Sequence, residues 1–234
     1  MIIDVSQHQG VIEWKEVGKV IDYAILRCGY GSNIHSQHDK QFNYNATQCE
    51  KYGIPYGVYL YSYAKNLNNN LSEINHILSQ IKNRNVVMPL YYDIEETDIC
   101  YKYDVKKFAE NFVRTVRANG YEAGIYSGEY IFKKYLNTVD CDSRWVARYN
   151  RDKPRIKYDI WQYTSTGVLS GINKYVDLNI YKDSDLFSDF YYDNLVNAVL
   201  EGMYGNGADR KKKLYSMGVN YWKVQNMINI LMKM

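Results

Sequence analysis

The chain has 234 residues, of which 46% are hydrophobic and 24% are charged. This balance is typical of a folded globular protein, and it excludes global disorder or a fibrous repeat. No uninterrupted apolar run reaches about 18 residues, so the sequence predicts no membrane-spanning helix. The length suits one barrel-sized domain with a small appendage.

The formal net charge of +3 lies entirely in the C-terminal tail. From Asp193 onward, six basic residues stand against three acidic ones, whereas the two signs balance in the rest of the chain. A neutral body with a basic tail predicts that the tail binds an anionic polymer, whose identity charge alone does not give.

The cysteine and histidine patterns predict neither a cofactor nor a metal site. The four cysteines are far apart without a CxxC pair, which favours reduced structural thiols. The metal-like spacing of His35 and His38 lies in a polar segment, which favours a solvated loop.

The first residues enter a strand-like run without the basic and apolar regions of a secretory signal, so we expect synthesis in a cytoplasm.

Strand and helix patterns alternate along the body. Strands rich in Val, Ile and Tyr are predicted at residues 2–6, 23–30, 55–62, 88–95, 123–127, 144–149, 159–164 and 175–181. Helices are predicted at residues 37–52, 71–82 and 104–119, with Gly53 and Gly120 as stop signals. This order predicts an α/β fold, an irregular TIM-like β/α barrel.

The pattern changes after Tyr149, where helical signals end and strand signals continue. The later part of the barrel is therefore expected to be poor in helices, with a hairpin around Gly171 that presents Asp177 on its return strand. Apolar residues return at helical spacing near Asp193, and breaks at residues 205–207 and at Gly218 divide the tail into three short helices. The predicted division is a barrel at 1–187, a linker at 188–192 and a three-helix module at 193–234.

Two acidic side chains end the fourth predicted strand. Asp93 and Glu95 are two positions apart, so they point to the same face with Cα atoms roughly 6.6 Å apart. Because neighbouring carboxyl groups push their pKa values apart, one can donate a proton while the other stays ionised. This pattern indicates glycoside hydrolysis, and a helix cap or a Ca²⁺ or Mg²⁺ site is the alternative.

Further polar residues are expected at the same barrel opening. Asp4 ends the first strand and Asp177 lies on the last, and first and last strands are neighbours in a closed barrel. Arg27 and Arg148 occupy other strand positions. The aromatic and amide candidates for sugar contacts are Tyr61, Tyr63, Tyr126, Trp161, Gln162 and Tyr163.

Four segments of the body together resemble the lysozymes of glycoside hydrolase family 25. They are DVSQHQG at 4–10, YDIE at 92–95, WQYT at 161–164 and VDLN at 176–179. The resemblance implies an irregular β/α barrel and cleavage of the β-1,4 bond between N-acetylmuramic acid and N-acetylglucosamine in peptidoglycan. It implies that Glu95 is the general acid and Asp93 the second catalytic carboxylate, with Asp4 and Asp177 as flanking acids of the same site.

The tail is similar to one copy of the CW_7 cell-wall-binding repeat. The similarity is carried by LVNAVLEGMYGNG at 195–207, followed by Arg210, Leu214, Gly218, Val219, Tyr221, Val224 and Gln225. The alternatives are a dimerisation bundle and a helix-turn-helix that binds nucleic acid through residues 210–213. The glycosidase resemblance of the body favours the wall.

Together these features predict a phage endolysin that lyses a Gram-positive host after holin-dependent release. Its expected partner is the glycan of peptidoglycan, with no nucleic acid and no membrane. A non-catalytic peptidoglycan-binding protein on the same barrel is the alternative, and a chitinase-like enzyme would differ only in substrate. An amidase or peptidase would need a Zn²⁺ set or a Cys–His pair that the sequence does not contain in recognisable form.

Overall fold

The computed structural model describes residues 1–149, 152–182 and 189–232. Its centre is a closed barrel with the strands in sequence order, which confirms the predicted fold class. The strands are β1 (Ile2–Val5), β2 (Tyr23–Tyr30), β3 (Tyr56–Tyr61), β4 (Leu90–Asp93), β5 (Ala123–Gly128), β6 (Ser143–Ala147), β7 (Ile160–Gly167) and β8 (Val176–Tyr181). Strands β1 to β7 run parallel, whereas β8 is antiparallel to both β7 and β1.

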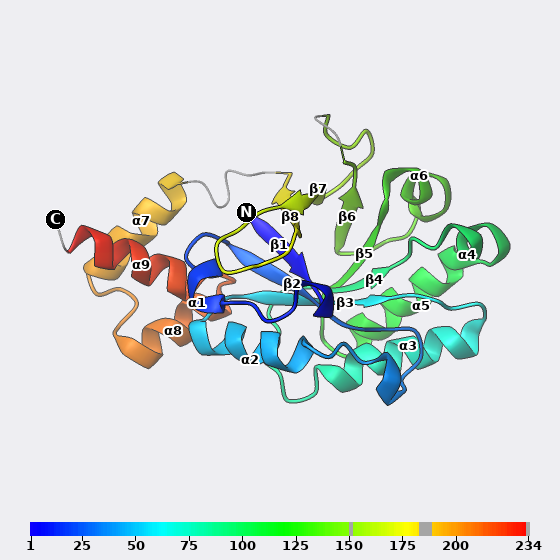
Figure 1. Ribbon diagram of the computed structural model, residues 1–234, viewed down its shortest axis with the longest axis horizontal. Helices are drawn as coiled ribbons and strands as arrows, with labels where there is room; N and C mark the ends of the chain where they lie inside the picture. The colour runs from blue at the N-terminus through cyan, green and yellow to red at the C-terminus, as the bar shows by residue number, and fades with distance from the viewer. Residues whose placement is uncertain (150–151, 183–188, 233–234) are drawn as a thin grey trace.

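Helices cover the first two thirds of the barrel. They are α1 (Trp14–Val17), α2 (Phe42–Tyr52), α3 (Leu67–Gln80), α4 (Thr97–Lys102), α5 (Val105–Ala118) and α6 (Glu129–Ile131). Helices α2, α3 and α5 lie along the outside of the sheet (Figure 1). The described residues between β6 and β8 contain no helix, so the prediction of a helix-poor last part is confirmed.

The ends of the helices follow local signals. Gly53 ends α2 in the left-handed region with φ of 68°, which glycine adopts without steric cost. The side chain of Asn66 accepts a hydrogen bond from the Asn69 backbone and so caps α3. The asparagine run at 68–70 therefore lies inside α3, and the predicted start of this helix at residue 71 is wrong.

Side chains alternate between two apolar layers. Odd and even positions of each strand point to opposite faces. The inner layer fills the barrel with aromatic rings, and Trp145 contacts Tyr59, Tyr91 and Tyr126 at ring-centroid distances of 4.4 to 5.8 Å. The outer layer packs the sheet against the helices. The inner layer forms a rigid floor beneath one open end of the barrel.

A buried carboxylate links α3 to the neighbouring strands. Glu73 accepts hydrogen bonds from Ser62 Oγ at 2.8 Å, from the Tyr63 backbone at 2.7 Å and from the Tyr92 hydroxyl. Asn70 Nδ2 also donates to the Tyr92 hydroxyl, at 3.0 Å. Burial raises the pKa of Glu73, and these three donors lower it in part.

The tail contains α7 (Asp189–Leu200), α8 (Gly207–Ser216) and α9 (Tyr221–Leu231). Helix α7 includes residues 189–192, which were expected to be linker, and residue 188 lies outside the described residues. The tail has its own apolar core, formed by Tyr192, Leu195, Val196, Val199, Leu214, Val219, Val224 and Ile228. Leu200, Met203 and Leu231 lie outside this core and are exposed. In the part of the chain that the structure describes, no helix is long and apolar enough to cross a membrane.

Helices α8 and α9 pack against the end of the barrel at which β2, β3 and β4 begin. Asn220 is fully buried there, and its Nδ2 donates to the carbonyl oxygens of Gly18 and Ile21, both at 3.0 Å. Lys223 forms an ion pair with Asp22 at 2.8 Å. Four further hydrogen bonds run from Lys211, Tyr215, Tyr221 and Trp222 to backbone oxygens of Lys51, Asn85, Gly53 and Lys15. Figure 1 shows the tail at one end of the molecule, with α4 and α6 near the other.

Candidate active site

The acidic residues singled out in the sequence converge at the end of the barrel opposite the tail. They line a hollow of about 270 Å³ that we call the catalytic hollow. Its lining residues are Asp4, Ser6, His8, Gln9, Arg27, Tyr59, Tyr61, Asp93, Glu95, Tyr126, Trp145, Tyr149, Gln162 and Asp177. The structure thus brings together all four candidate acids and three of the candidate sugar-contacting residues.

Strand β4 places the central pair of acids. Tyr92 packs in the outer layer, so Asp93 and Glu95 both face the hollow, as side-chain alternation requires. Burial raises the pKa of Asp93 well above its usual range, and the neighbouring Glu95 and Asp4 raise it further. Burial also raises the pKa of Glu95, followed by the charges of Glu96 and Asp177. A raised pKa favours the protonated form of a carboxyl group, which is the form that a general acid needs.

Strands β1 and β8 bring the second pair of acids into contact. Asp4 and Asp177 are partners in the antiparallel register between these strands. Burial and then the charge of Asp177 raise the pKa of Asp4 well above its usual range. Burial raises the pKa of Asp177 to about 6. The four acids therefore share one electrostatic environment in which few of them can be ionised together.

Amide side chains hold Asp4 in place. Its Oδ2 accepts hydrogen bonds from Gln162 Nε2 at 2.9 Å and from Asn179 Nδ2 at 2.8 Å. Gln162 Oε1 in turn accepts from the hydroxyls of Tyr126 and Tyr149, both at 2.7 Å. This chain of hydrogen bonds fixes the wall of the hollow formed by β1, β7 and β8.

Asp93 is held differently. Its Oδ1 is buried and accepts no hydrogen bond from the residues that the structure describes. The charge of Arg27 lowers the pKa of Asp93 in part. Arg27 itself is fixed by an ion pair with Asp39 at 2.8 Å, and Asp39 also accepts the backbone N–H of Gln7. One oxygen of Asp93 is thus available to a bound substrate.

Three residues of the site escaped the sequence analysis or received no role there. Tyr149 follows β6 and completes the Gln162 network. Glu96 accepts a hydrogen bond from the Tyr61 hydroxyl at 2.7 Å, and its charge raises the pKa of Glu95. Arg27 was noted only as a strand position. Adjacency to Glu95 was the one available signal for Glu96, whereas the contacts of Tyr149 and Arg27 depend on the folded barrel.

Three expected sugar-contacting aromatics lie outside the catalytic hollow. Because Gln162 faces the barrel interior, Trp161 and Tyr163 on the same strand face outward and pack with the outer layer. Trp161 Nε1 donates to the Arg148 backbone oxygen at 2.9 Å. Tyr63 is 43% exposed beside the hollow, with its ring 5.1 Å from that of Tyr61. Trp161, Tyr163 and Tyr63 therefore do not line the catalytic hollow, and sugar contact by any of them stays a prediction.

The Arg148 side chain makes a structural contact outside the catalytic hollow. It forms an ion pair with Glu129, which begins α6. The backbone N–H of Arg155 donates to the same carboxylate, and these contacts lower the pKa of Glu129 despite its partial burial. Arg148 thus ties the segment after β6 to α6 and does not line the catalytic hollow.

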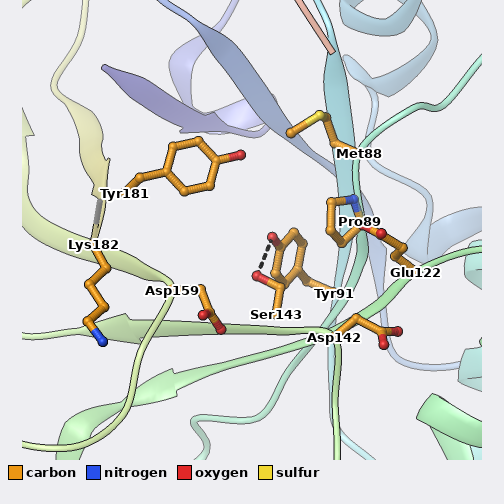
Figure 2. Close-up of a pocket in the computed structure, with 9 residues that line it drawn as sticks. All are labelled: Met88, Pro89, Tyr91, Glu122, Asp142, Ser143, Asp159, Tyr181 and Lys182. Atoms are coloured by element: carbon orange, nitrogen blue, oxygen red, sulfur yellow. Dashed lines mark hydrogen bonds between the residues drawn. The ribbon is translucent and has the colours of Figure 1, made fainter. Parts of the chain in front are cut away.

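A second hollow of about 270 Å³ lies at the opposite end of the barrel, where β4 to β7 begin (Figure 2). Two of its three carboxylates, Asp142 and Asp159, are engaged in structural contacts. Asp142 binds Arg117 and the Ala123 backbone, and Asp159 accepts the Arg144 backbone N–H at 2.7 Å. The contacts with Arg117 and the Ala123 backbone lower the pKa of Asp142. None of the four candidate acids lines this hollow.

The histidine pair is not a simple solvated loop. His38 lies between His35 and His76, at ring-centroid distances of 5.3 and 4.8 Å, and His76 is fully buried. Burial lowers the pKa of both His38 and His76. Within residues 1–149, 152–182 and 189–232, no three His, Cys, Asp or Glu side chains are placed to hold a metal ion.

Comparisons with known proteins agree with this geometry. Residues 3–172 match the model of glycosyl hydrolases family 25, and residues 193–232 match the CW_7 repeat. The catalytic domain of endolysin ply40, from bacteriophage P40 of Listeria monocytogenes, is 27% identical with a TM-score of 0.72, over 80% of this chain and 94% of that one. The modular autolysin LytC of Streptococcus pneumoniae is 29% identical with a TM-score of 0.63, over 76% of this chain and 45% of that one.

The uncharacterized protein YegX of Escherichia coli O157:H7 is 25% identical over 200 residues, which cover 78% of this chain and 70% of YegX. The family match extends over well more than half of the chain and contains Asp4, Asp93 and Glu95. It ends before Asp177, which the fold nevertheless places beside Asp4. The chain belongs to glycosyl hydrolases family 25 and carries one C-terminal CW_7 repeat.

Proposed function

We propose that the protein is a muramidase, which cleaves the β-1,4 bond between N-acetylmuramic acid and N-acetylglucosamine in peptidoglycan. Family membership and the likeness to an endolysin and an autolysin support a peptidoglycan hydrolase. The observation that carries the proposal is the convergence of Asp4, Asp93, Glu95 and Asp177 in one hollow, with raised pKa values and a free oxygen on Asp93.

Glu95 suits the role of general acid. It is only partly buried, so it can reach a substrate, and burial together with the charge of Glu96 raises its pKa, which favours the protonated form. The proton goes to the oxygen of the leaving N-acetylglucosamine as the glycosidic bond breaks. Asp93 is the second carboxylate, beside the positive charge that develops on the sugar ring, and water completes the hydrolysis at the anomeric carbon.

The CW_7 repeat is proposed to retain the enzyme on the cell wall. Lys212 and Lys213 on α8 are exposed, which suits an anionic wall polymer. The replacement of both residues by Glu should weaken co-sedimentation with purified walls, and it should weaken it most at low ionic strength. The same change at Lys153 and Lys157, which are exposed on the barrel, is the matched control. Equal loss of binding in both variants would contradict the assignment to the tail.

We propose further that the protein acts as a phage endolysin against a Gram-positive host and is released by a holin-type pore. The likeness to ply40, which comes from a Listeria phage, and the CW_7 repeat support this origin. The corresponding test is lysis from without: the purified protein should reduce the turbidity of Gram-positive cells more strongly than that of intact Gram-negative cells.

The decisive experiment is product identification. Purified walls are incubated with the protein, and the new chain ends are identified by mass spectrometry after reduction with borohydride. New reducing N-acetylmuramic acid supports the proposal. New reducing N-acetylglucosamine or new free amines would replace it with a glucosaminidase or an amidase or peptidase. Wall binding without any new ends would indicate a non-catalytic binding protein, and Glu95→Gln provides the inactive control.

A further inference from the structure

A third hollow, distinct from the one at the opposite end of the barrel, adjoins the catalytic hollow. It has a volume of about 610 Å³, within the usual range for a ligand site, and it lies at the turn between β7 and β8. We call it the hairpin hollow. Its lining residues are His8, Gln9, Val168, Ile172, Asn173, Lys174 and Tyr175. Because His8 and Gln9 also line the catalytic hollow, the two spaces share one wall.

The wall between the two hollows is held in place. Ser6 and Gln9 form a capping box around the turn Gln7–Gln9, in which Gln9 Oε1 accepts the Ser6 backbone N–H at 2.9 Å. Gln9 Nε2 donates to the Tyr175 backbone oxygen at 3.1 Å and thereby links this turn to the β7–β8 hairpin. The hairpin hollow is therefore a defined extension of the catalytic hollow.

The lining is amphipathic and carries one positive charge. Val168 is 76% exposed and Tyr175 is 65% exposed, while Ile172 is buried and forms the apolar base. Lys174 is exposed, and no carboxylate of the described residues lies within 4.0 Å of its ammonium group. Large apolar side chains left exposed around a single cation suit a ligand that carries both methyl groups and a carboxylate.

We infer that the hairpin hollow binds the peptide stem of the substrate, with Lys174 paired to a stem carboxylate. This inference rests on the proposed muramidase function. In peptidoglycan the stem is attached through a lactyl ether to N-acetylmuramic acid, the sugar whose anomeric bond is cut. With that sugar beside Asp93 and Glu95, its stem extends into adjoining space, and the methyl groups of stem alanines fit against Val168, Ile172 and Tyr175.

The charged side chains favour placement of the peptide stem in the hairpin hollow over placement along the opposite wall of the catalytic hollow. Tyr61 on that wall donates its hydroxyl to Glu96, which lies behind it, and the cation of that wall, Arg27, is already paired with Asp39. Stem carboxylates would be repelled by Glu96 and would find no free cation in Arg27. Lys174 offers the complementary charge on the hairpin side.

The test compares two forms of one substrate. Glycan chains that bear stems are prepared from purified walls, and a portion is stripped of stems with an N-acetylmuramoyl-L-alanine amidase. The wild-type enzyme should show a higher kcat/KM for stem-bearing chains, measured from new reducing ends. Lys174→Gln should lower the ratio of the two kcat/KM values about two- to fivefold, since an exposed charge pair contributes up to about 1 kcal/mol. Lys174→Glu should lower the ratio further.

Lys182→Gln is the matched control, because Lys182 is an exposed lysine that lines the hollow at the opposite end of the barrel (Figure 2). The ratio of kcat/KM for stem-bearing chains to kcat/KM for stem-free chains in Lys182→Gln should equal that of the wild type. Equal wild-type kcat/KM values for both substrates, or an unchanged ratio in Lys174→Gln, would overturn the stem site while leaving the muramidase function in place. If neither substrate yields new reducing ends, the proposed function itself fails, and the inference falls with it.

Discussion

The unpaired Oδ1 atom of Asp93 lowers the stability of the folded state. A buried acceptor without a hydrogen bond typically costs about 1–3 kcal/mol relative to its solvated state. Asp93 Oδ1 has no hydrogen bond among the described residues, and three nearby carboxyl groups add electrostatic repulsion. Such a group has no role in packing, but it offers a substrate N–H or O–H a ready partner. Function therefore explains a residue that folding alone would disfavour.

At Glu95 we expect the largest catalytic effect of any single substitution. Glu95→Gln keeps the shape of the side chain but removes the proton that the leaving oxygen needs, so turnover should fall about 10²- to 10⁴-fold. Initial rates of reducing-end formation measure this change. Thermal unfolding and wall co-sedimentation are the controls and should stay close to the wild type. Turnover near the wild-type rate would show that another group supplies the proton.

The raised pKa of Asp177 predicts a pH-dependent stability. The folded state holds this proton up to about pH 6, against 3.8 for the ordinary group, so the favourable contribution is complete below about pH 4 and is lost as the pH rises through 6. The shift corresponds to at most about 3 kcal/mol. Asp177→Asn should therefore raise Tm relative to the wild type at pH 7.5 and have little effect at pH 4, while it lowers turnover.

Asp98→Asn is the control for this measurement, because Asp98 is an exposed residue of α4. Its Tm difference from the wild type should be small at both pH values. A Tm of Asp177→Asn that falls at pH 7.5, with the activity per folded molecule unchanged, would instead assign Asp177 a structural role.

Glu73 joins helix α3 to the turn after β3 and to strand β4. The three groups that donate to it are Ser62 Oγ, the Tyr63 backbone and the Tyr92 hydroxyl. Glu73→Ala would leave these donors buried without their acceptor, and we expect a loss of about 2–4 kcal/mol in the free energy of unfolding. Urea denaturation followed by tryptophan fluorescence measures the loss.

Glu110→Ala provides a comparison on a neighbouring helix, because Glu110 is exposed on α5 and forms only a surface pair with Lys106 at 3.7 Å. Its unfolding free energy should change by less than about 1 kcal/mol. If Glu73→Ala is no less stable than Glu110→Ala, the buried contacts of Glu73 contribute nothing net.

The barrel strands and the acidic pair were predictable because they depend on local periodicity. The two-residue spacing predicts that Asp93, the last residue of β4, and Glu95, just beyond it, share one face, and both line the catalytic hollow. The same alternation makes Trp161 and Gln162 face opposite ways, but only the closed barrel shows that Gln162 is the inward one. The partners of Glu73 come from two segments far from it in the sequence, the turn after β3 and β4, so no local pattern reveals them.

At the scale of the whole molecule, the CW_7 repeat is attached to the barrel by more than the chain that links them. Asn220 and Lys223 bind residues 18–22, and the Tyr221 backbone binds Gly53. A Cβ atom at Gly53 would approach the Tyr221 Cβ to 2.8 Å, so this contact requires glycine. The repeat thus sits at a fixed place at the end of the barrel remote from the catalytic hollow.

The docked tail should stabilise the barrel. Asn220→Ala removes two buried hydrogen bonds to the barrel and the cap of α9, a loss of about 2–4 kcal/mol, which is roughly 5–10 °C in Tm for a chain of this size. Scanning calorimetry measures this shift. Asn194→Ala, an exposed position on α7, should leave Tm nearly unchanged. A barrel transition that keeps the wild-type Tm in Asn220→Ala would show that the two units unfold independently.

The pairing of β1 with β8 has a consequence for the timing of activity during synthesis. Asp4 emerges from the ribosome among the first residues, but its partners Gln162, Asp177 and Asn179 are added only as β7 and β8 are made. Until then the barrel is an open sheet with two unpaired edges, and no catalytic hollow exists. The proposed catalytic site therefore forms late in synthesis, only after β8 has been made.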